Sequence, residues 1–193
     1  MSSARLQAIQ IAREKIALSP LYLDTETTGR ERDSEIIEVS VIDDLGEVVY
    51  ESTVRPTRPI PREAIRIHGI TNELVQSAPT WMLIWPQLEN ALAGRVVGIY
   101  NAEFDLRMMQ QTHARYRMRW SSVEGFSPFC IMKLYAQYYG EWNNARGSYR
   151  WQSLDDAGRQ CHIPLPHTHR ARDDSLLARA VLRHIASDPG INR

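Results

Sequence analysis

Short apolar runs broken by turn residues predict five strands along this chain. The turn "DLGE" separates the second run from the third, so these two are expected to form a hairpin that follows the first strand. The runs cover residues 21–24, 34–43, 48–56, 95–100 and 128–132.

Helical periodicity fills most of the remaining chain. Residues 4–18 predict a helix that ends before Pro20, with Leu6, Ile9 and Ile16 as its apolar stripe. Strands that come first as a hairpin and then alternate with helices predict an α/β fold, in which helices cover a mixed sheet. Further helices are predicted over residues 61–69, 71–75, 79–94, 101–116, 133–140, 151–163 and 171–187.

The length of 193 residues predicts one main domain over residues 20–193, preceded by a helical extension over residues 1–19. Lys plus Arg and Asp plus Glu both number 23, so the zero net charge argues against a purely electrostatic binder but allows local patches. The charged residues of the helix at 4–18 predict no signal peptide, and no apolar run has the ~20 residues of a membrane span. Cys130 and Cys161 form no CxxC pair, which favours a reduced cytoplasmic protein.

Two carboxylates, Asp24 and Glu26, lie one residue apart at the end of the first predicted strand. Because strand side chains alternate, both are expected to point to one face, at the strand end where α/β sheets bind ligands. The Thr27–Gly29 turn that follows offers backbone N–H groups to a ligand. The competing interpretation is a pair of solvated acids at a strand–loop junction.

A third acid, Asp105, is expected in the early turns of the helix at 101–116, with Asn101 as its N-cap. Met108 and Met109 lie three and four residues later, so Asp105 shares their apolar face. An acid on such a face is costly unless something compensates its charge. The alternative is an acid that favours the positive end of the helix dipole on the solvated rim.

A fourth acid, Asp174, lies three residues before Leu177, on the buried stripe predicted for the last helix. Asp173 is rotated away from this stripe, and we expect it to be solvated or to cap the helix. His169 precedes the helix in an irregular stretch, while His162 and His167 carry no signal beyond that of ordinary histidines.

Together the four carboxylates predict a metal site, because they would repel one another if all were ionised in one cleft. Hard divalent cations with oxygen ligands remove that repulsion. Two such ions about 3.5–4 Å apart stabilise the attacking and leaving oxygens of a phosphoryl displacement. A histidine, whose ordinary pKa is about 6.5, is suited to accept the proton of the attacking water.

With these motifs in order, the sequence resembles the DEDDh 3′→5′ exonucleases, which include the proofreading subunit of bacterial replicative polymerases and RNase T. The motifs are "DTETTG" at Asp24, "NAEFD" ending at Asp105, and His169 followed five residues later by Asp174. The segment "HGIT", beginning at His68, matches a further stretch of the family. The resemblance implies an RNase H-like fold with a five-stranded mixed sheet whose second strand is antiparallel.

The resemblance also implies two Mg²⁺ or Mn²⁺ ions and release of 5′-mononucleotides from a 3′ end. By resemblance, Asp24 bridges both metals, and Glu26 and Asp174 complete the site that holds the attacking water. Asp105 supports the second metal, and His169 is the general base. The residues that by resemblance line the substrate pocket are Thr27, Thr28, His68 and Asn101.

One position departs from many family members, which have His where this chain has Tyr100 before the second motif. Basic and aromatic stretches, "HARYRMRW" and "ARGSYRW", fit a nucleic-acid enzyme, with Tyr149 or Trp151 available to stack on a base. Simple loop packing of these two aromatics is the competing interpretation. A solvated helix face is the alternative for Arg115, Arg117 and Arg119.

Three functions remain open at this stage. The first is a 3′→5′ exonuclease on DNA, with single-stranded or frayed ends favoured as substrate. The second is the same chemistry on RNA ends. The sequence does not separate RNA from DNA, because the RNA-specific contact is to a 2′-OH and no motif identifies that contact. The third is an inactive nucleic-acid-binding module, against which the intact acids and His169 argue. No motif identifies a protein partner.

Overall fold

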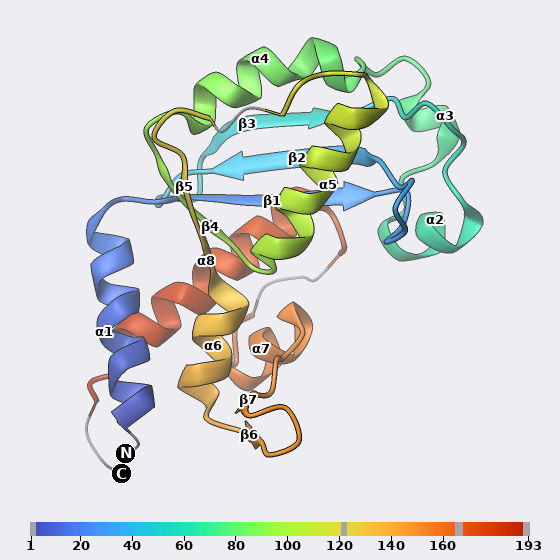
Figure 1. The fold of residues 1–193 in the computed structure, drawn as a ribbon. Coiled ribbons are helices and arrows are strands. Elements are labelled where there is room, and N and C mark those ends of the chain that lie inside the picture. The colour runs from blue at the N-terminus through green and yellow to red at the C-terminus, as the bar shows by residue number, and fades with distance from the viewer. Residues whose placement is uncertain (1–2, 121–122, 165–167, 191–193) are drawn as a thin grey trace.

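A five-stranded mixed sheet forms the centre of the molecule in the computed structural model, which describes residues 3–120, 123–164 and 168–190 (Figure 1). Its spatial order is β3-β2-β1-β4-β5, with β1, β4 and β5 parallel and β2 antiparallel to both of its neighbours. The predicted mixed sheet with an antiparallel second strand is therefore confirmed. The strands are β1 Leu21–Thr27, β2 Ile36–Ile42, β3 Val48–Thr53, β4 Val96–Ile99 and β5 Ser127–Cys130.

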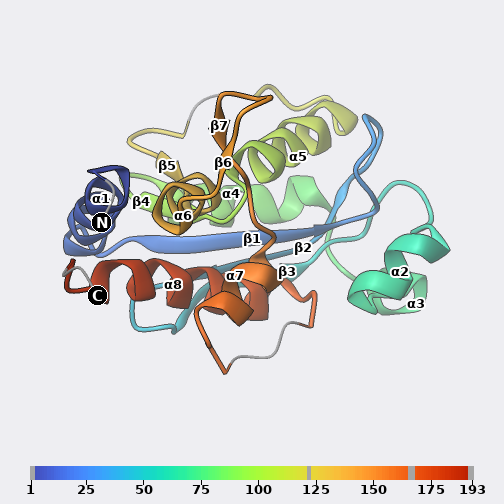
Figure 2. The same cartoon turned by 90° about the horizontal axis from the view of Figure 1, so that it is seen from below.

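Helices cover both faces of the sheet, with α8 along one face and α5 along the other (Figure 2). Tyr22 and Ile42 share one core with α1, α6, α7 and α8, whereas Leu23 and Val39 share the other with α4 and α5. None of the helices in the described ranges is long and apolar enough to cross a membrane. The helices are α1 Ser3–Ala17, α2 Arg62–His68, α3 Asn72–Val75, α4 Trp81–Leu92, α5 Ala102–Arg115, α6 Ile131–Tyr139, α7 Leu154–Gln160 and α8 Ala171–Ser187.

The observed elements differ from the predicted ones mainly at their ends. β1 continues through both acids to Thr27. β5 ends at Cys130, and α6 begins at the next residue, so the predicted run at 128–132 is divided between a strand and a helix. The hairpin of β6 (Trp142–Asn143) and β7 (Ser148–Tyr149) was not predicted, because two-residue strands carry no periodicity.

β1 is longer than its parallel neighbour β4, and this difference creates an opening in the sheet. The last pair of the β1–β4 ladder is Leu23 with Ile99, whereas β1 remains paired with β2 as far as Thr27. Continuing the register would place Tyr100 opposite Asp24, but α5 begins at Ala102 and turns the chain away. The carboxyl end of β1 is therefore open on the side where β4 would otherwise run.

The N-terminal helix α1 packs against α6 and α8, far from the end of β1 that carries the acids (Figure 1). Its buried stripe consists of Ala8, Ile9 and Ala12, whereas Leu6 is 45% exposed, so its predicted place in the apolar stripe was wrong. Small alanines allow the close approach of the neighbouring helices.

Polar contacts fix α1 to the end of α8. The Arg5 guanidinium donates to the Tyr138 carbonyl oxygen at 2.9 Å and to Asp188 Oδ2 at 2.7 Å, and it lies 3.8 Å from the centre of the Tyr138 ring. Burial acts to raise the pKa of Asp188, but hydrogen bonds from Gly190 N–H and Arg5 outweigh it and hold that pKa at about 2. The pair is therefore ionised at neutral pH.

Arg5→Ala tests whether α1 contributes to the stability of the whole fold. We expect the free energy of unfolding in urea to fall by about 1–3 kcal/mol, because Asp188 loses its charged donor in a half-buried place. Arg66→Ala is the matched control, since its pair with Glu63 is exposed and should change stability by less than about 0.5 kcal/mol. Equal effects of the two changes would show that the α1 contact is no stronger than a surface pair.

Candidate active site

The predicted site residues converge on one cavity of about 790 Å³ at the carboxyl end of β1. Its walls come from β1, the segment after β1, α2, the start of α5 and the start of α8. The cavity lies where the sheet opens beyond the end of β4, which is the usual place for a ligand in a sheet of this kind.

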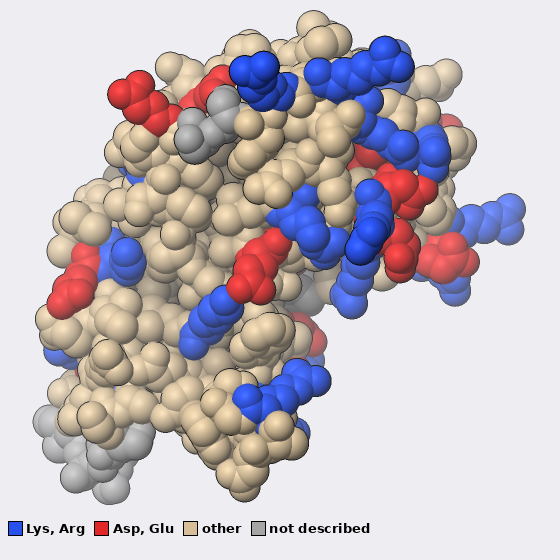
Figure 3. Space-filling view, viewed as in Figure 1, with Lys and Arg blue, Asp and Glu red and all other residues tan. Residues whose placement is uncertain are grey.

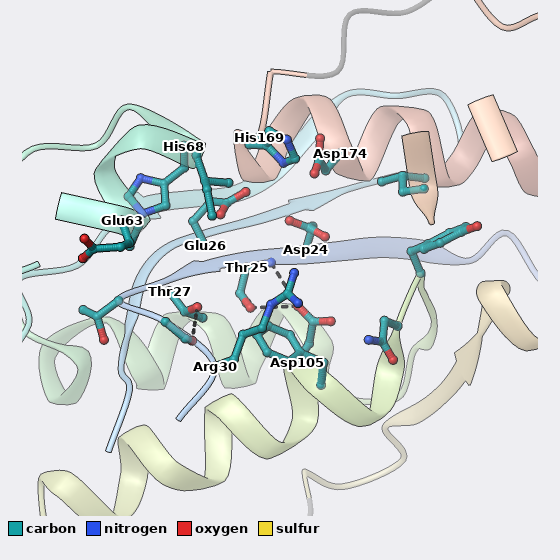
Figure 4. A pocket seen from close by; sticks show the side chains of 18 of the residues that line it. Asp24, Thr25, Glu26, Thr27, Arg30, Glu63, His68, Asp105, His169 and Asp174 are labelled. Carbon is teal, nitrogen blue, oxygen red and sulfur yellow. Dashed lines mark hydrogen bonds between the residues drawn. The ribbon is translucent and has the colours of Figure 1, made fainter. Parts of the chain in front are cut away.

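Three carboxylates meet in this cavity. One oxygen from each of Asp24, Glu26 and Asp174 lies within 4.8 Å of one oxygen of the other two. Asp24 and Glu26 share the face of β1 that α8 covers, as their spacing predicted, and Asp174 projects from α8 toward them (Figure 4). Two elements far apart in sequence therefore assemble one compact set of oxygen donors.

Asp105 reaches the same cavity from α5, where it is 3% exposed beside the fully buried Met108 and Met109, as predicted. Its Oδ1 accepts hydrogen bonds from the Thr25 backbone N–H at 3.1 Å and from the Thr25 hydroxyl at 2.7 Å. Thr25 lies in the part of β1 that has lost its β4 partner, so the Asp105 carboxylate takes the place of a strand. This contact compensates an acid on an otherwise apolar helix face.

The four acids hold their protons more tightly than ordinary carboxyls do. Burial, followed by the neighbouring carboxylates, raises the pKa of Asp24 well above its usual range and that of Glu26 to about 9. Burial also raises the pKa of Asp105 to about 7, although the hydrogen bonds from Thr25 oppose the shift. Burial raises the pKa of Asp174 to about 6, against the opposing charge of His169.

The chemistry of this donor set fits a divalent metal ion. Hard cations such as Mg²⁺ and Mn²⁺ bind carboxylate oxygens, and the three clustered oxygens supply such ligands from a fixed scaffold. A cation would also remove the mutual repulsion that raises the pKa of the buried acids. Asp105 lies outside the compact trio and is restrained by Thr25, so it is suited to a supporting place at the edge of a metal site.

His169 lies on the cavity wall in the left-handed region of the backbone, with a φ of 50°, two residues before the first residue of α8. Figure 4 shows its ring on the same side of the cavity as Asp174. Asp173, predicted to be solvated or capping, accepts a hydrogen bond from the Thr168 hydroxyl. His167 lies outside the described residues, and His162 is exposed on the loop after α7.

The residues expected to line a substrate pocket all border the cavity, although their contacts differ. Thr27 Oγ1 donates to the Gly29 carbonyl oxygen at 2.7 Å, and Thr28 Oγ1 accepts from Glu35 N–H at 2.9 Å, so both hydroxyls also hold the chain after β1. The His68 Nδ1 accepts from Ile70 N–H at 3.0 Å, and burial lowers the pKa of this ring, which is neutral at pH 7.

Asn101 occupies the predicted N-cap position of α5, but its side chain makes no capping hydrogen bond within the described chain. Its neighbour Tyr100 also borders the cavity, and the Tyr100 hydroxyl lies 3.1 Å from the carbonyl oxygens of Gln152 and Ser153. Tyr100 therefore links the rim of the cavity to the start of α7.

Three side chains of α5 hold the loop that follows β1. Arg107, Gln111 and Arg115, four residues apart on one helix face, donate to backbone carbonyl oxygens of this loop at 3.1–3.3 Å. Arg115 is consequently half-buried. Arg117 and Arg119 are exposed but lie beyond the end of α5, so they do not form the solvated helix face that was their alternative interpretation. The carbonyl oxygens belong to Arg30, Glu31, Asp33 and Ser34.

Arg30 extends from this loop across the cavity, toward Thr25 and Asp105 (Figure 4). Among the described residues that border the cavity, it is the sole Lys or Arg. Basic side chains also gather over α5 and the segment after β1, interleaved with acids (Figure 3). Neither Arg30 nor the buried acid Glu38 was identified from sequence, although a charge inside the apolar run "IIEVSVI" is a signal that could have revealed Glu38.

The two aromatics proposed to stack on bases lie away from this cavity. Trp151 is 53% exposed, and Tyr149 packs edge-on against Trp142 with ring centres 5.1 Å apart. Tyr149 therefore has the loop packing that was its competing interpretation, while base stacking by Trp151 stays a prediction.

Comparisons with known proteins agree on one family. The chain matches the family model described as Exonuclease, RNase_T, over residues 21–182. It is 35% identical over 193 residues to a protein named uncharacterized exonuclease CP81 of Escherichia phage 186, a match that covers 96% of this chain and 97% of the phage protein.

Solved structures extend the agreement to the fold. Exonuclease X in complex with 5′ overhanging duplex DNA has a TM-score of 0.64 at 26% identity, covering 89% of this chain and 93% of that one. The nuclease domain of 3′hExo, a DEDDh family member bound to rAMP, has a TM-score of 0.70 at 16% identity, covering 91% and 95%. The predicted resemblance and the RNase H-like fold are confirmed.

The crowded acids predict that the metal-free protein loses stability as the pH rises. Their pKa values in the folded state lie above the value of about 4 in the unfolded chain, so folding keeps protons that the unfolded chain releases. The penalty therefore grows from about pH 4 toward about pH 9, where Glu26 ionises. Asp24→Asn should relieve it by at least about 1 kcal/mol at pH 8 and by less at pH 5.

Thermal unfolding in EDTA at the two pH values measures this difference, and added Mg²⁺ should raise the wild-type transition temperature more than that of the variant. Asp33→Asn is the control, because Asp33 is 61% exposed and paired only at the surface with Arg58. If Asp24→Asn lowered the stability of the metal-free protein at pH 8, the acids would not be in the strained arrangement described here.

Proposed function

This chain belongs to the exonuclease family that the RNase_T model describes, and from that premise we propose that it is a metal-dependent 3′→5′ exonuclease. The observation that carries the proposal is the convergence of Asp24, Glu26 and Asp174 with His169 in one cavity. The reaction would be hydrolysis of the terminal phosphodiester to release 5′-mononucleotides one at a time. The chain would then consist of an exonuclease domain over residues 20–193 and an extension over residues 1–19 that supports it.

Asp24, Glu26 and Asp174 would hold the catalytic cations, two Mg²⁺ or Mn²⁺ ions, with Asp105 in support. When bound, such ions supply positive charge at the phosphoryl oxygens and lower the pKa of a water molecule. The protein's own part is to fix the carboxylates: the β1 backbone sets the first two, and the start of α8 sets the third. The Thr25 hydrogen bonds hold Asp105 at the edge.

His169 would act as the general base. Its place at the cavity wall, directly before the N-cap residue of α8, brings an imidazole close to the carboxylates without making it part of the clustered oxygen set. The ring would accept the proton from the attacking water as the oxygen adds to phosphorus.

Thr27, Thr28, His68 and Asn101 would line the pocket for the terminal nucleotide, because all four border the cavity beside the acids. We favour single-stranded or frayed DNA as substrate, and RNA ends are the alternative. An inactive binding module is disfavoured, since it would have no use for acids whose burial raises their pKa values this far.

Polarity is tested with matched oligonucleotides labelled at the 3′ or the 5′ end, in DNA and in RNA, with Mg²⁺. We expect a 3′ label to appear at once as a mononucleotide, while a 5′ label passes through a ladder of shortening products. A blocked 3′ terminus should protect the strand, and EDTA should stop the reaction because the acids need a cation.

Asp24→Asn serves as the control for contaminating nuclease and should show no turnover. Cleavage of circular single-stranded DNA at the rate of the linear strand would contradict the proposal, since it would identify an endonuclease. Faster digestion of RNA than DNA would select the alternative substrate.

The proposed base is tested by His169→Ala. Loss of a positioned proton acceptor should reduce turnover by about 10²–10⁴-fold. Metal binding measured by calorimetry should stay nearly unchanged, because the clustered ligands are carboxylates. His162→Ala is the control, since this histidine is exposed and does not border the cavity.

Two results would contradict this assignment. If His169→Ala abolished metal binding, the ring would be a ligand. If turnover of His169→Ala matched that of His162→Ala, another group would be the base.

A further inference from the structure

A further buried acid, Glu38, lies beside the cavity without bordering it. Glu38 is 2% exposed in the middle of β2, whose seven residues are all buried. In the antiparallel ladder it is the direct partner of Glu26, so both side chains project to the same face of the sheet. Like charges directly opposite are destabilising, and a buried carboxylate requires a charged or hydrogen-bonded partner.

Arg170 supplies that partner from a position 132 residues later in the chain. Its Nε donates to both carboxylate oxygens of Glu38 at 3.1 Å, and its Nη2 donates to Oε1. This is the fork geometry in which a guanidinium restrains a carboxylate in direction as well as distance. Burial of the Glu38 side chain, which is 3% exposed, shields the pair from water on one side.

Glu38 makes a second contact, with the backbone at the start of α8. Its Oε2 accepts from Ala171 N–H at 2.9 Å, which is one of the N–H groups that a helix leaves unsatisfied in its first turn. Within the described chain, the N-cap residue Arg170 provides no side-chain cap of its own. A carboxylate of β2 therefore caps α8 from outside, where a negative charge is also favoured by the helix dipole.

The position of this contact in the sequence gives it a consequence for the site. Arg170 directly follows His169, and Ala171 is three residues before Asp174. The Glu38 carboxylate therefore fixes the short segment that aims both groups at Asp24 and Glu26. A buried ion pair is weak evidence for stability, because well-packed apolar residues often stabilise as much. The pair restrains the direction of the bound groups, so its clearer use is to orient the segment that carries His169 and Asp174.

We propose that Glu38 and Arg170 are positioning residues, which set the places of His169 and Asp174 relative to the β1 carboxylates. Neither residue borders the cavity, so both act through the segment at the start of α8. The inference deepens the proposed function and rests on it for its kinetic consequence.

A matched ion pair at the other end of α8 makes the test specific. Arg183 Nη1 lies 2.7 Å from Asp44 Oδ2, just after the end of β2, so it also joins α8 to the β2 side of the sheet. Arg170→Ala and Arg183→Ala therefore each remove one arginine, from the N-cap and from the body of α8 respectively, and one ion pair to the same part of the sheet. Only the first pair is next to the proposed catalytic groups.

Arg170→Ala should lower kcat about 10²-fold, the scale of an ångström-sized misplacement, with KM changed less than about 3-fold. Its Mn²⁺ affinity in calorimetry should fall about 10–100-fold, as expected when a partner that orients a ligand is lost. Arg183→Ala should leave both quantities within about 2-fold, even where it lowers the transition temperature as much. Arg170→Lys keeps the charge but loses the fork, so its kcat and affinity should be intermediate.

Three outcomes decide the proposal. Equal kcat and Mn²⁺ affinity in Arg170→Ala and Arg183→Ala would overturn it, since the pair would then only stabilise the fold. If Arg170→Ala does not fold, Arg170→Lys decides, and wild-type kcat and affinity in that variant would overturn it as well. If the wild type hydrolyses no nucleic acid, the proposed function fails, while the Mn²⁺ affinities still show whether Arg170 positions Asp174.

Discussion

Repulsion among carboxylates brought together at the end of β1 is the constraint around which this structure is built. Burial and mutual charge raise the pKa of each acid in the cluster, so the fold must supply the energy to keep them close. That energy comes from the apolar half of the same strand. Leu21, Tyr22 and Leu23 are fully buried between two cores, one on each face of the sheet, and they hold the strand whose next residues carry the charge.

The four acids are held in place in three different ways, which involve β1 itself and both faces of the sheet. The β1 backbone sets the direction of Asp24 and Glu26. Asp105 is fixed by hydrogen bonds to Thr25 across the gap left by β4, and Asp174 by a helix whose start is tied to β2. A disturbance on one face of the sheet therefore reaches only part of the cluster, and the shared strand keeps the remaining acids in place.

Local signals in the sequence predicted the elements and most of the site, because strand alternation and helical periodicity act over a few residues. The spacing of Asp24 and Glu26 is one such local signal, and the apolar helix face that Asp105 shares with Met108 and Met109 is another. Long-range contacts had no such signal: Thr25 with Asp105 spans 80 residues, and Glu38 with Arg170 spans 132. The buried stripe of α1 was also misassigned, because the close approach of α6 and α8 selects small alanines over Leu6.

The site exists only because β4 is short. If the strand ran two residues further in its present register, Asn101 would lie beside Thr25 and its backbone would take the N–H that Asp105 now accepts. The start of α5 would shift with it, and the cavity would become ordinary sheet. Grafting this centre onto another parallel sheet therefore requires trimming the neighbouring strand as much as it requires placing four acids.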